Sequence, residues 1–213
     1  MSIEFWENQF EKKCTELCSI ADAAHDITHY YRVVRTAKKL AIEEKANFEV
    51  VMPAVWLHDF VYISKDDPRR AQASRVSAEA ATAWLKEIGY PQNFLNEIVH
   101  AISAHSFSAQ ITPETIEAKV VQDADRLDGI GAIGIARCMM TGGTLNRRLY
   151  DPEEPFAVTR VQNDLLNTLD HFYVKLFKTA ETMQTNSGKL EAKRRAQIMT
   201  QYLDDLRIEV QGK

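Results

Sequence analysis

Two groups of residues in this chain could do chemistry at a metal ion. One is the doublet His58-Asp59, which interrupts the apolar segment AVWLHDFVYI. A buried charge without a partner is costly, so an aspartate there needs a cation or a full set of hydrogen bonds. The other is the acidic cluster Asp123, Asp125 and Asp128. Imidazoles and carboxylates are common ligands of divalent transition metals, although the doublet alone would also suit a structural pair between two helices.

A third group lies upstream, in the segment HDITHYYRVVRTA. It places His25, Asp26 and His29 at the start of a predicted helix, with Arg32 and Arg35 on the following turns. Asp26 could cap this helix, or His25 and Asp26 could border a metal pocket. The chain thus offers a histidine, then a His-Asp pair, then a distal aspartate.

In this order and context the residues resemble the HD superfamily of metal-dependent phosphohydrolases. Carried over position by position, the resemblance places the first metal ligand on His29, within HYYRV, and the pair on His58 and Asp59. It places the last ligand on Asp125, within ADRL. Asp123 competes for this last position but lacks that context, and it could instead orient a histidine ligand.

Further segments extend the resemblance. HSFS at 105–108, LYDPEEP at 149–155 and DHFYVKL at 170–176 are similar to short, stand-alone bacterial HD proteins. Some of those proteins are nucleoside triphosphate pyrophosphohydrolases. The resemblance covers about residues 20–205 and implies an all-α fold, a single compact HD-domain helical bundle over 1–213 with the N-terminal helix packed on its core.

The implied site holds one divalent cation. Mixed nitrogen and oxygen ligation suits manganese, nickel, iron or zinc, and suits magnesium less well. Such an ion acidifies water and polarises a phosphoryl group, so hydrolysis of a phosphate ester or anhydride is expected. The first hypothesis is cleavage of a nucleoside or deoxynucleoside triphosphate to monophosphate and pyrophosphate. The alternatives are a phosphomonoesterase, a cyclic-nucleotide phosphodiesterase, and a non-catalytic sensor of metal and nucleotide.

A general base and phosphate contacts must come from other residues. Asp66 or Asp67 could accept a proton from water, while Asp67 also suits the cap of the next helix. His105 could contact a substrate phosphate or support a ligand, and His100 is interpreted as a structural histidine. The basic residues that could neutralise phosphates are Arg32, Lys65, Arg69, Arg126, Arg147, Arg148 and Lys175.

Composition narrows the partners of such a site. The formal net charge of −4 lacks the positive excess that binding to a long nucleic acid requires. No apolar run approaches the roughly 20 residues of a membrane span, and residues 1–13 lack the continuous apolar region expected of a signal peptide. The three cysteines, Cys14, Cys18 and Cys138, show no disulfide spacing and predict a reducing cytoplasm. A small nucleotide or phosphate ester is the expected partner. The sequence does not decide the oligomeric state, and a homodimer is one of the possibilities.

The elements that must position these residues are helices. Apolar residues at intervals of three and four predict helices over 3–22 and 28–46. The nearly all-apolar segment 50–63 is interpreted as a buried helix, although its β-branched residues would also suit a buried strand. The other predicted elements are helices over 68–88, 93–105, from 112 onward, 158–183 and 187–209, and a functional loop over 141–155 that is rich in glycine and proline.

Overall fold

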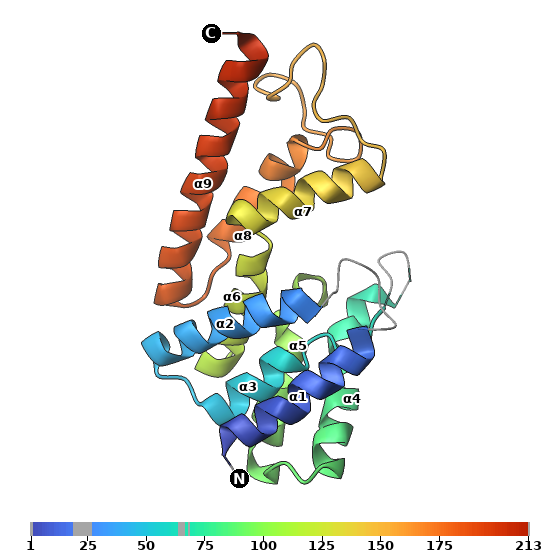
Figure 1. The fold of residues 1–213 in the computed structure, drawn as a ribbon, viewed down its shortest axis with the longest axis vertical. Coiled ribbons are helices and arrows are strands. Elements are labelled where there is room, and N and C mark those ends of the chain that lie inside the picture. The colour runs from blue at the N-terminus through green and yellow to red at the C-terminus, as the bar shows by residue number, and fades with distance from the viewer. Residues whose placement is uncertain (1, 19–26, 64–66, 68, 213) are drawn as a thin grey trace. The chain divides into compact units, whose positions relative to one another are not determined.

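The computed structural model describes residues 2–18, 27–63, 67 and 69–212. Throughout these residues every regular element is a helix, and the one bridge between extended segments is isolated, joining Arg148 and Asn167 (Figure 1). The expected all-α class is therefore confirmed. None of the helices in the described part of the chain is both long and apolar enough to cross a membrane.

The chain forms two compact units, each described here by itself. The first unit comprises Met1–Asp125 and Gln184–Gly188, and the second comprises Arg126–Met183 and Lys189–Lys213. That residues 1–213 act as a single domain stays a prediction.

The first unit is a helical bundle built around α3 (Phe48–Trp56). This helix packs against α1 (Ile3–Cys18), α2 (Ile27–Glu44) and α5 (Leu95–His105), and α5 also packs against α4 (Ala73–Glu87). Seven residues of α3, from Val50 to Trp56, are buried. The remaining elements of this unit are the short 3-10 turns Arg70–Gln72, Gln92–Phe94 and Phe107–Ala109 and most of α6 (Ile116–Asp128).

Helix α3 ends sooner than the sequence predicts. Asn47 caps its start by accepting a hydrogen bond from the amide of Glu49 at 3.0 Å. At the other end, the ring of His58 donates from Nδ1 to the carbonyl of Val55 at 2.8 Å. In a continuing helix the amide of Asp59 would use that carbonyl. The expected helix over 50–63 therefore stops at residue 56, and the doublet lies in the turn that follows.

The second unit contains α7 (Gly131–Thr144), a π-helical turn (Phe172–Leu176) that leads into α8 (Phe177–Glu181), and all but the first turn of α9 (Asn186–Gln211). Phe172 stacks on Tyr202 of α9, with ring centroids 5.9 Å apart. This contact joins the π-helical turn to the long helix.

Two predictions about the second unit are wrong in their boundaries. The expected loop over 141–155 begins later, because α7 continues through Gly142 to Thr144. Gly142 lets this part of α7 approach Thr168 closely, since a Cβ at residue 142 would lie 2.2 Å from Oγ1 of Thr168. The expected helix over 158–183 is irregular until about residue 170, because side chains bind the backbone there: Asp170 accepts from the amide of Asn163 at 2.6 Å.

Candidate metal centre

Three side chains that the sequence places far apart converge in the first unit. His29 comes from the first turn of α2, His58 from the turn after α3, and Asp125 from α6. The Nε2 atoms of the two histidines lie 3.4 Å apart, and Oδ1 of Asp125 lies 3.7 Å and 3.8 Å from them. The three donor atoms all lie within 4.8 Å of one another, so they could hold a metal ion.

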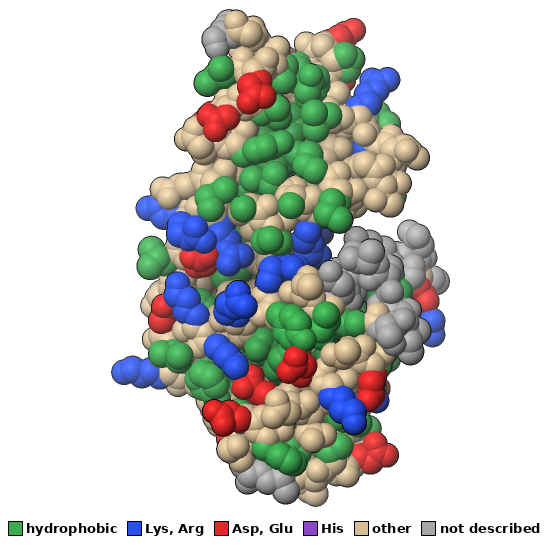
Figure 2. All heavy atoms as spheres, viewed as in Figure 1, with side chains coloured by type: hydrophobic (Ala, Val, Ile, Leu, Met, Phe, Trp, Pro, Cys, Tyr) green, Lys and Arg blue, Asp and Glu red, His purple; other side chains and the backbone are tan. Residues whose placement is uncertain are grey.

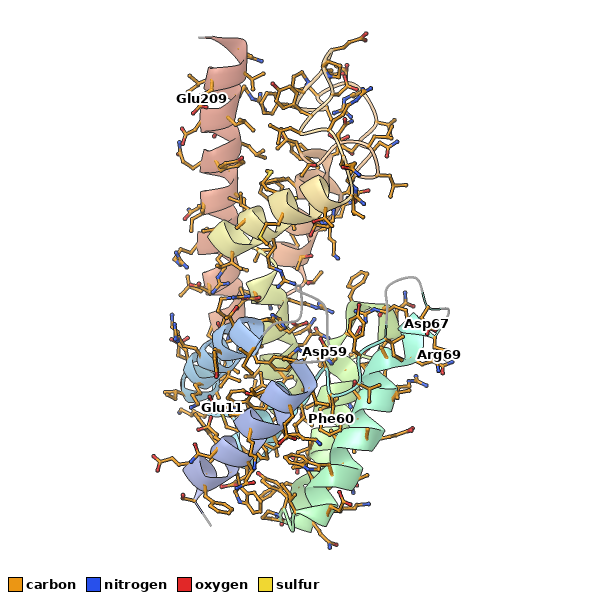
Figure 3. The ribbon with its side chains drawn as sticks, turned by 45° about the vertical axis from the view of Figure 1, so that its right-hand side comes forward. Glu11, Asp59, Phe60, Asp67, Arg69 and Glu209 are labelled. Atoms are coloured by element: carbon orange, nitrogen blue, oxygen red, sulfur yellow. The ribbon has the colours of Figure 1, made fainter. Side chains whose placement is uncertain are left out.

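Asp59 connects this group to a third histidine. Its Oδ2 atom lies 3.6 Å from Nε2 of His58, and its Oδ1 atom lies 3.6 Å from Nε2 of His105, the last residue of α5. His58, Asp59 and His105 thus form a second possible set of ligands. The five residues His29, His58, Asp59, His105 and Asp125 are called the histidine-aspartate cluster below. In Figure 3, Asp59 lies beside the ribbon of the first unit, while Asp67 and Arg69 lie farther along the chain.

Backbone carbonyls fix the orientation of two of the imidazoles. Nδ1 of His58 lies 2.8 Å from the carbonyl oxygen of Val55, and Nδ1 of His105 lies 2.6 Å from that of Ile102. A carbonyl can only accept, so each Nδ1 carries the proton and, in a neutral ring, Nε2 keeps its lone pair. Such a bond commonly orients histidines that ligate metals. Both Nε2 atoms face the cluster.

The protonation tendencies of these two histidines differ. Burial lowers the pKa of His58 and favours its neutral form, which is the form that ligates metals. Burial acts in the same direction on His105, but the nearby negative charges of Asp59 and Asp125 raise the pKa of His105 overall. The surroundings of the two imidazoles therefore shift their pKa values in opposite directions.

The donor set fits a divalent cation. Apart from the histidine pair at 3.4 Å, the contacts among the cluster's ring nitrogens and carboxylate oxygens span 3.6–3.8 Å. Those separations exceed the range of good hydrogen bonds. Lone pairs and negative oxygens that face one another at such distances are stabilised by a positive ion among them, and nitrogen with oxygen ligation suits a transition metal.

Asp123, the competing candidate, is engaged elsewhere in the first unit. Its fully buried carboxylate accepts hydrogen bonds from the amides of Gln184 and Thr185, each at 2.8 Å, and from the hydroxyl of Thr185 at 2.7 Å. A Cβ at Gly188 would lie 2.3 Å from the same carboxylate. These contacts attach the start of α9 to α6, so Asp123 has a structural task.

Asp67 is paired locally with Arg69. The amide of Arg69 donates to Oδ1 of Asp67 at 2.8 Å, and its guanidinium donates at 3.1 Å and 2.8 Å. The side-chain and backbone hydrogen bonds from Arg69 lower the pKa of Asp67 to about 2. Such a carboxylate is a weak base near neutral pH. The other candidates of this region, Lys65 and Asp66, lie outside the described residues, as do His25 and Asp26.

The remaining basic candidates lie outside the cluster. Arg32, on α2, donates to the hydroxyl of Thr28 at 2.9 Å. Arg126, which donates to the carbonyl of Thr182 at 3.3 Å, belongs to the second unit, as do Arg147, Arg148 and Lys175. His100 accepts a hydrogen bond from the amide of Glu114 at 2.9 Å, as expected of a structural histidine.

Two residues that support the cluster were not selected from the sequence. Tyr30 is buried, and its hydroxyl donates to the carbonyl of Asp59 at 3.2 Å. Burial, first of all, raises the pKa of Tyr30, so this donor stays protonated. Gln122 is also buried, and its amide donates to the carbonyl of Ala104 at 2.7 Å, next to His105. A glutamine directly after the apolar pair Val120-Val121 was the available signal.

Comparison with known proteins shows which family the chain resembles. The family model of the HD domain matches residues 26–130. The Bacillus subtilis protein YpgQ is 30% identical in an alignment 194 residues long that covers 89% of this chain and 86% of that protein.

Solved structures agree with this match over nearly the whole chain. An HD-superfamily hydrolase from Bacillus thuringiensis is 28% identical and superposes with a TM-score of 0.79, covering 100% of both chains. The structure of Bacillus subtilis YpgQ in complex with ADP is 28% identical, with a TM-score of 0.74, and covers 95% of this chain and 94% of that one. This chain belongs to the HD superfamily and is a metal-dependent phosphohydrolase.

Proposed function

We propose that the chain hydrolyses small nucleotides and, in particular, cleaves nucleoside or deoxynucleoside triphosphates to the monophosphate and pyrophosphate. One divalent cation would be held by His29, His58, Asp59 and Asp125. The observation that carries this proposal is the convergence of His29, His58 and Asp125, whose donor atoms lie within 4.8 Å of one another, with Oδ2 of Asp59 also 3.6 Å from Nε2 of His58.

The four proposed ligands would give the ion an electrically balanced site. Two neutral imidazoles and two carboxylates balance a charge of +2, and the carbonyl of Val55 holds the ring of His58 in place. When bound, the ion acidifies a water and polarises a phosphoryl oxygen. The candidate metals are manganese, nickel, iron and zinc, with magnesium less well suited to mixed nitrogen and oxygen ligation.

His105 is proposed as a substrate contact rather than a fifth ligand. It shares Asp59 with His58, and that carboxylate raises the pKa of His105 and favours its charged form. A protonated imidazole donates to a phosphate oxygen, whereas a metal ligand must be neutral. The competing arrangement, in which His58, Asp59 and His105 hold an ion, predicts that replacing His105 weakens metal binding.

The nucleotide assignment rests on a relative and on charge. A YpgQ structure contains ADP, and a diphosphate group in a protein so similar supports a nucleotide phosphate site here. The proposed phosphate contacts are Arg32 and Arg69 of the first unit, and Arg126, Arg147, Arg148 and Lys175 of the second.

The three cysteines are free thiols, which supports a reducing, cytoplasmic setting.

The test begins with protein stripped of metal by a chelator and reloaded with one metal at a time. Each form is assayed with nucleoside and deoxynucleoside triphosphates, 5′-monophosphates and cyclic nucleotides, and phosphate and pyrophosphate are measured separately. We expect pyrophosphate from triphosphates, and we expect Asp59→Asn protein to lose both activity and bound metal. Asp205→Asn, which changes an exposed carboxylate on α9, is the matched control and keeps both.

The other outcomes identify the alternatives. Phosphate released from monophosphates indicates a phosphomonoesterase, and opening of cyclic nucleotides indicates a phosphodiesterase. Tight nucleotide binding with metal but without turnover indicates a sensor. Full activity of Asp59→Asn protein after chelation and metal re-addition would refute the ligand assignment.

A further inference from the structure

The last turn of α5 is capped by side chains from three helices. The final carbonyls of a helix have no amide partner within the helix, and the chain leaves α5 in an extended conformation at Ser106 (φ −75°, ψ 133°). Three successive carbonyls accept hydrogen bonds from side chains: Ile102 from Nδ1 of His105 at 2.6 Å, Ser103 from the hydroxyl of Ser74 at 2.9 Å, and Ala104 from the amide of Gln122 at 2.7 Å. Residues of α4 and α6 thus hold the backbone next to His105.

All three capping side chains are buried. Ser74 and Gln122 are each 2% exposed, and His105 is 4% exposed. Among the described residues, no histidine side chain is visible on the face drawn in Figure 2. A buried carbonyl that loses its donor is costly. Removal of the donor of Ser74 or of Gln122 should therefore shift the last turn of α5.

Gln122 uses only one half of its side-chain amide. Its Nε2 atom donates to the carbonyl of Ala104, whereas its buried Oε1 atom has no hydrogen-bond donor among the described residues. Such an atom lowers stability, and an apolar side chain of similar volume would avoid that cost. The donor half of Gln122 therefore has a task beyond stabilising the core.

The group that depends most directly on this turn is the ring of His105. Its Nδ1 atom is fixed to Ile102 of the same turn, and its Nε2 atom lies 3.6 Å from Oδ1 of Asp59 in the histidine-aspartate cluster. A shift of the backbone at Ala104 would carry the ring with it. Because hydrogen bonds weaken steeply when their geometry is lost, a small shift changes which atoms Nε2 can contact.

We propose that Ser74 and Gln122 are positioning residues that act through His105. Each holds one carbonyl of the last turn of α5, and together they set where Nε2 of His105 faces a phosphate oxygen of the substrate. This inference rests on the proposed function, in which His105 contacts the substrate. Neither Ser74 nor Gln122 needs to touch the substrate or the metal ion.

The first test is a double-mutant cycle with the metal-loaded full chain and a nucleoside triphosphate. Gln122→Met removes the donor at similar volume, and Ser74→Ala removes the hydroxyl. In each variant KM should rise at least about tenfold, the loss of one hydrogen bond to a charged group. The value of kcat and the metal bound per chain should stay near those of the wild type. In a His105→Gln background the same changes should add no further loss, because the ring through which they act is already absent.

The second test follows the ring directly and needs no activity. The Nδ1 proton of His105 gives its own signal in the nuclear magnetic resonance spectrum of the zinc-loaded or metal-free chain, assigned by its disappearance in His105→Gln. Because the last turn holds this proton on the carbonyl of Ile102, its exchange with water should be slow in the wild type. In Gln122→Met and Ser74→Ala the exchange should be at least about tenfold faster.

Tyr90→Phe is the matched control. The hydroxyl of the buried Tyr90 also donates to a backbone carbonyl, that of Glu49 at 2.7 Å, but at the start of α3. Its loss should leave both KM and the exchange of the His105 proton as in the wild type. The same changes in Tyr90→Phe as in the two capping variants would overturn the inference.

The outcomes separate this inference from the proposed function. If no nucleotide is turned over, or if His105→Gln leaves KM unchanged, the proposed function or its substrate contact fails, and the exchange measurement still decides the positioning. Equal exchange in the wild type and in both capping variants overturns the inference. A further loss of full size in the His105→Gln background overturns it as well. Variants on two different helices guard against one that fails to fold, and circular dichroism establishes folding in each.

Discussion

Carboxylates are held in two different ways in the two units. In the second unit, Asp170 accepts hydrogen bonds at 2.6–2.7 Å from Arg160 and Asn163. In the first unit, Asp59 and Asp125 face imidazole nitrogens at 3.6–3.8 Å. The former distances belong to charge-assisted hydrogen bonds, and the latter exceed them. Asp170 stabilises the fold, whereas the cluster keeps carboxylates turned toward histidines where a cation fits.

The same contrast recurs within two residues of α6. Asp123 is fully buried and accepts from two amides and a hydroxyl, while the side chain of Asp125 is 29% exposed and faces His29 and His58. Position in the sequence hardly distinguishes the two. Their surroundings predict opposite consequences when each carboxylate becomes an amide.

Asp125→Asn should produce the largest effect, and on activity alone. An amide is a poor metal ligand, so we expect kcat/KM to fall about 1000-fold, roughly 4 kcal/mol of transition-state stabilisation. The free energy of unfolding without metal should stay equal or rise, because one of two nearby negative charges is removed. Kinetics with each metal and urea unfolding in chelator test both parts. More than a tenth of wild-type activity would contradict the comparison.

Asp123→Asn should have the opposite profile. Its amide group would face backbone donors in a buried place, so we expect the free energy of unfolding to fall by about 2–3 kcal/mol. Bound metal per folded molecule should match the wild type. Urea unfolding and elemental analysis measure the two quantities, with exposed Asp205→Asn as control. A variant that is stable but has lost its metal would assign Asp123 to the site instead.

The sequence predicts the site candidates better than the boundaries of the elements. His29, His58 and Asp125 are recognisable because metal binding needs these residue types and because their order and context resemble the HD superfamily, and the structure brings them within 4.8 Å. Their role as ligands stays a prediction. The sequence could rank Asp125 above Asp123 only by context. The structural difference between the two aspartates comes from the amides of residues 184 and 185, which donate to Asp123. Those residues are distant in sequence, so sequence context alone could not reveal the contact.

Boundaries failed where side chains compete for the backbone. The ring of His58 takes the carbonyl that would extend α3. Val158, Val161 and Leu165 recur at helical spacing, which predicted a helix, but they are exposed residues of the loop fixed by Arg160 and Asp170. The spacing of apolar residues is compatible with a helix, but it does not show whether those residues are buried.

The smallest effect expected is a pH dependence of stability from Glu191 on α9, a carboxylate paired like Asp170. Hydrogen bonds from Arg194 and Arg195, at 2.7–2.9 Å, lower its pKa from 4.5 to about 2. Because the folded pKa is below the unfolded one, this pairing stabilises the protein fully above pH 4.5. The stabilisation is lost as the pH falls from 4.5 toward 2. Screening at a partly exposed site limits this stabilisation to about 1 kcal/mol.

Urea unfolding between pH 7 and pH 3 should show this loss of stability in the wild type and not in Glu191→Gln. The control Glu43→Gln changes a carboxylate that lies 4.0 Å from a lysine, and it should follow the wild type. Parallel curves of unfolding free energy against pH for all three proteins would mean that close pairing at Glu191 contributes nothing to stability. That result would weaken the distinction between carboxylates that accept close hydrogen bonds and carboxylates that do not.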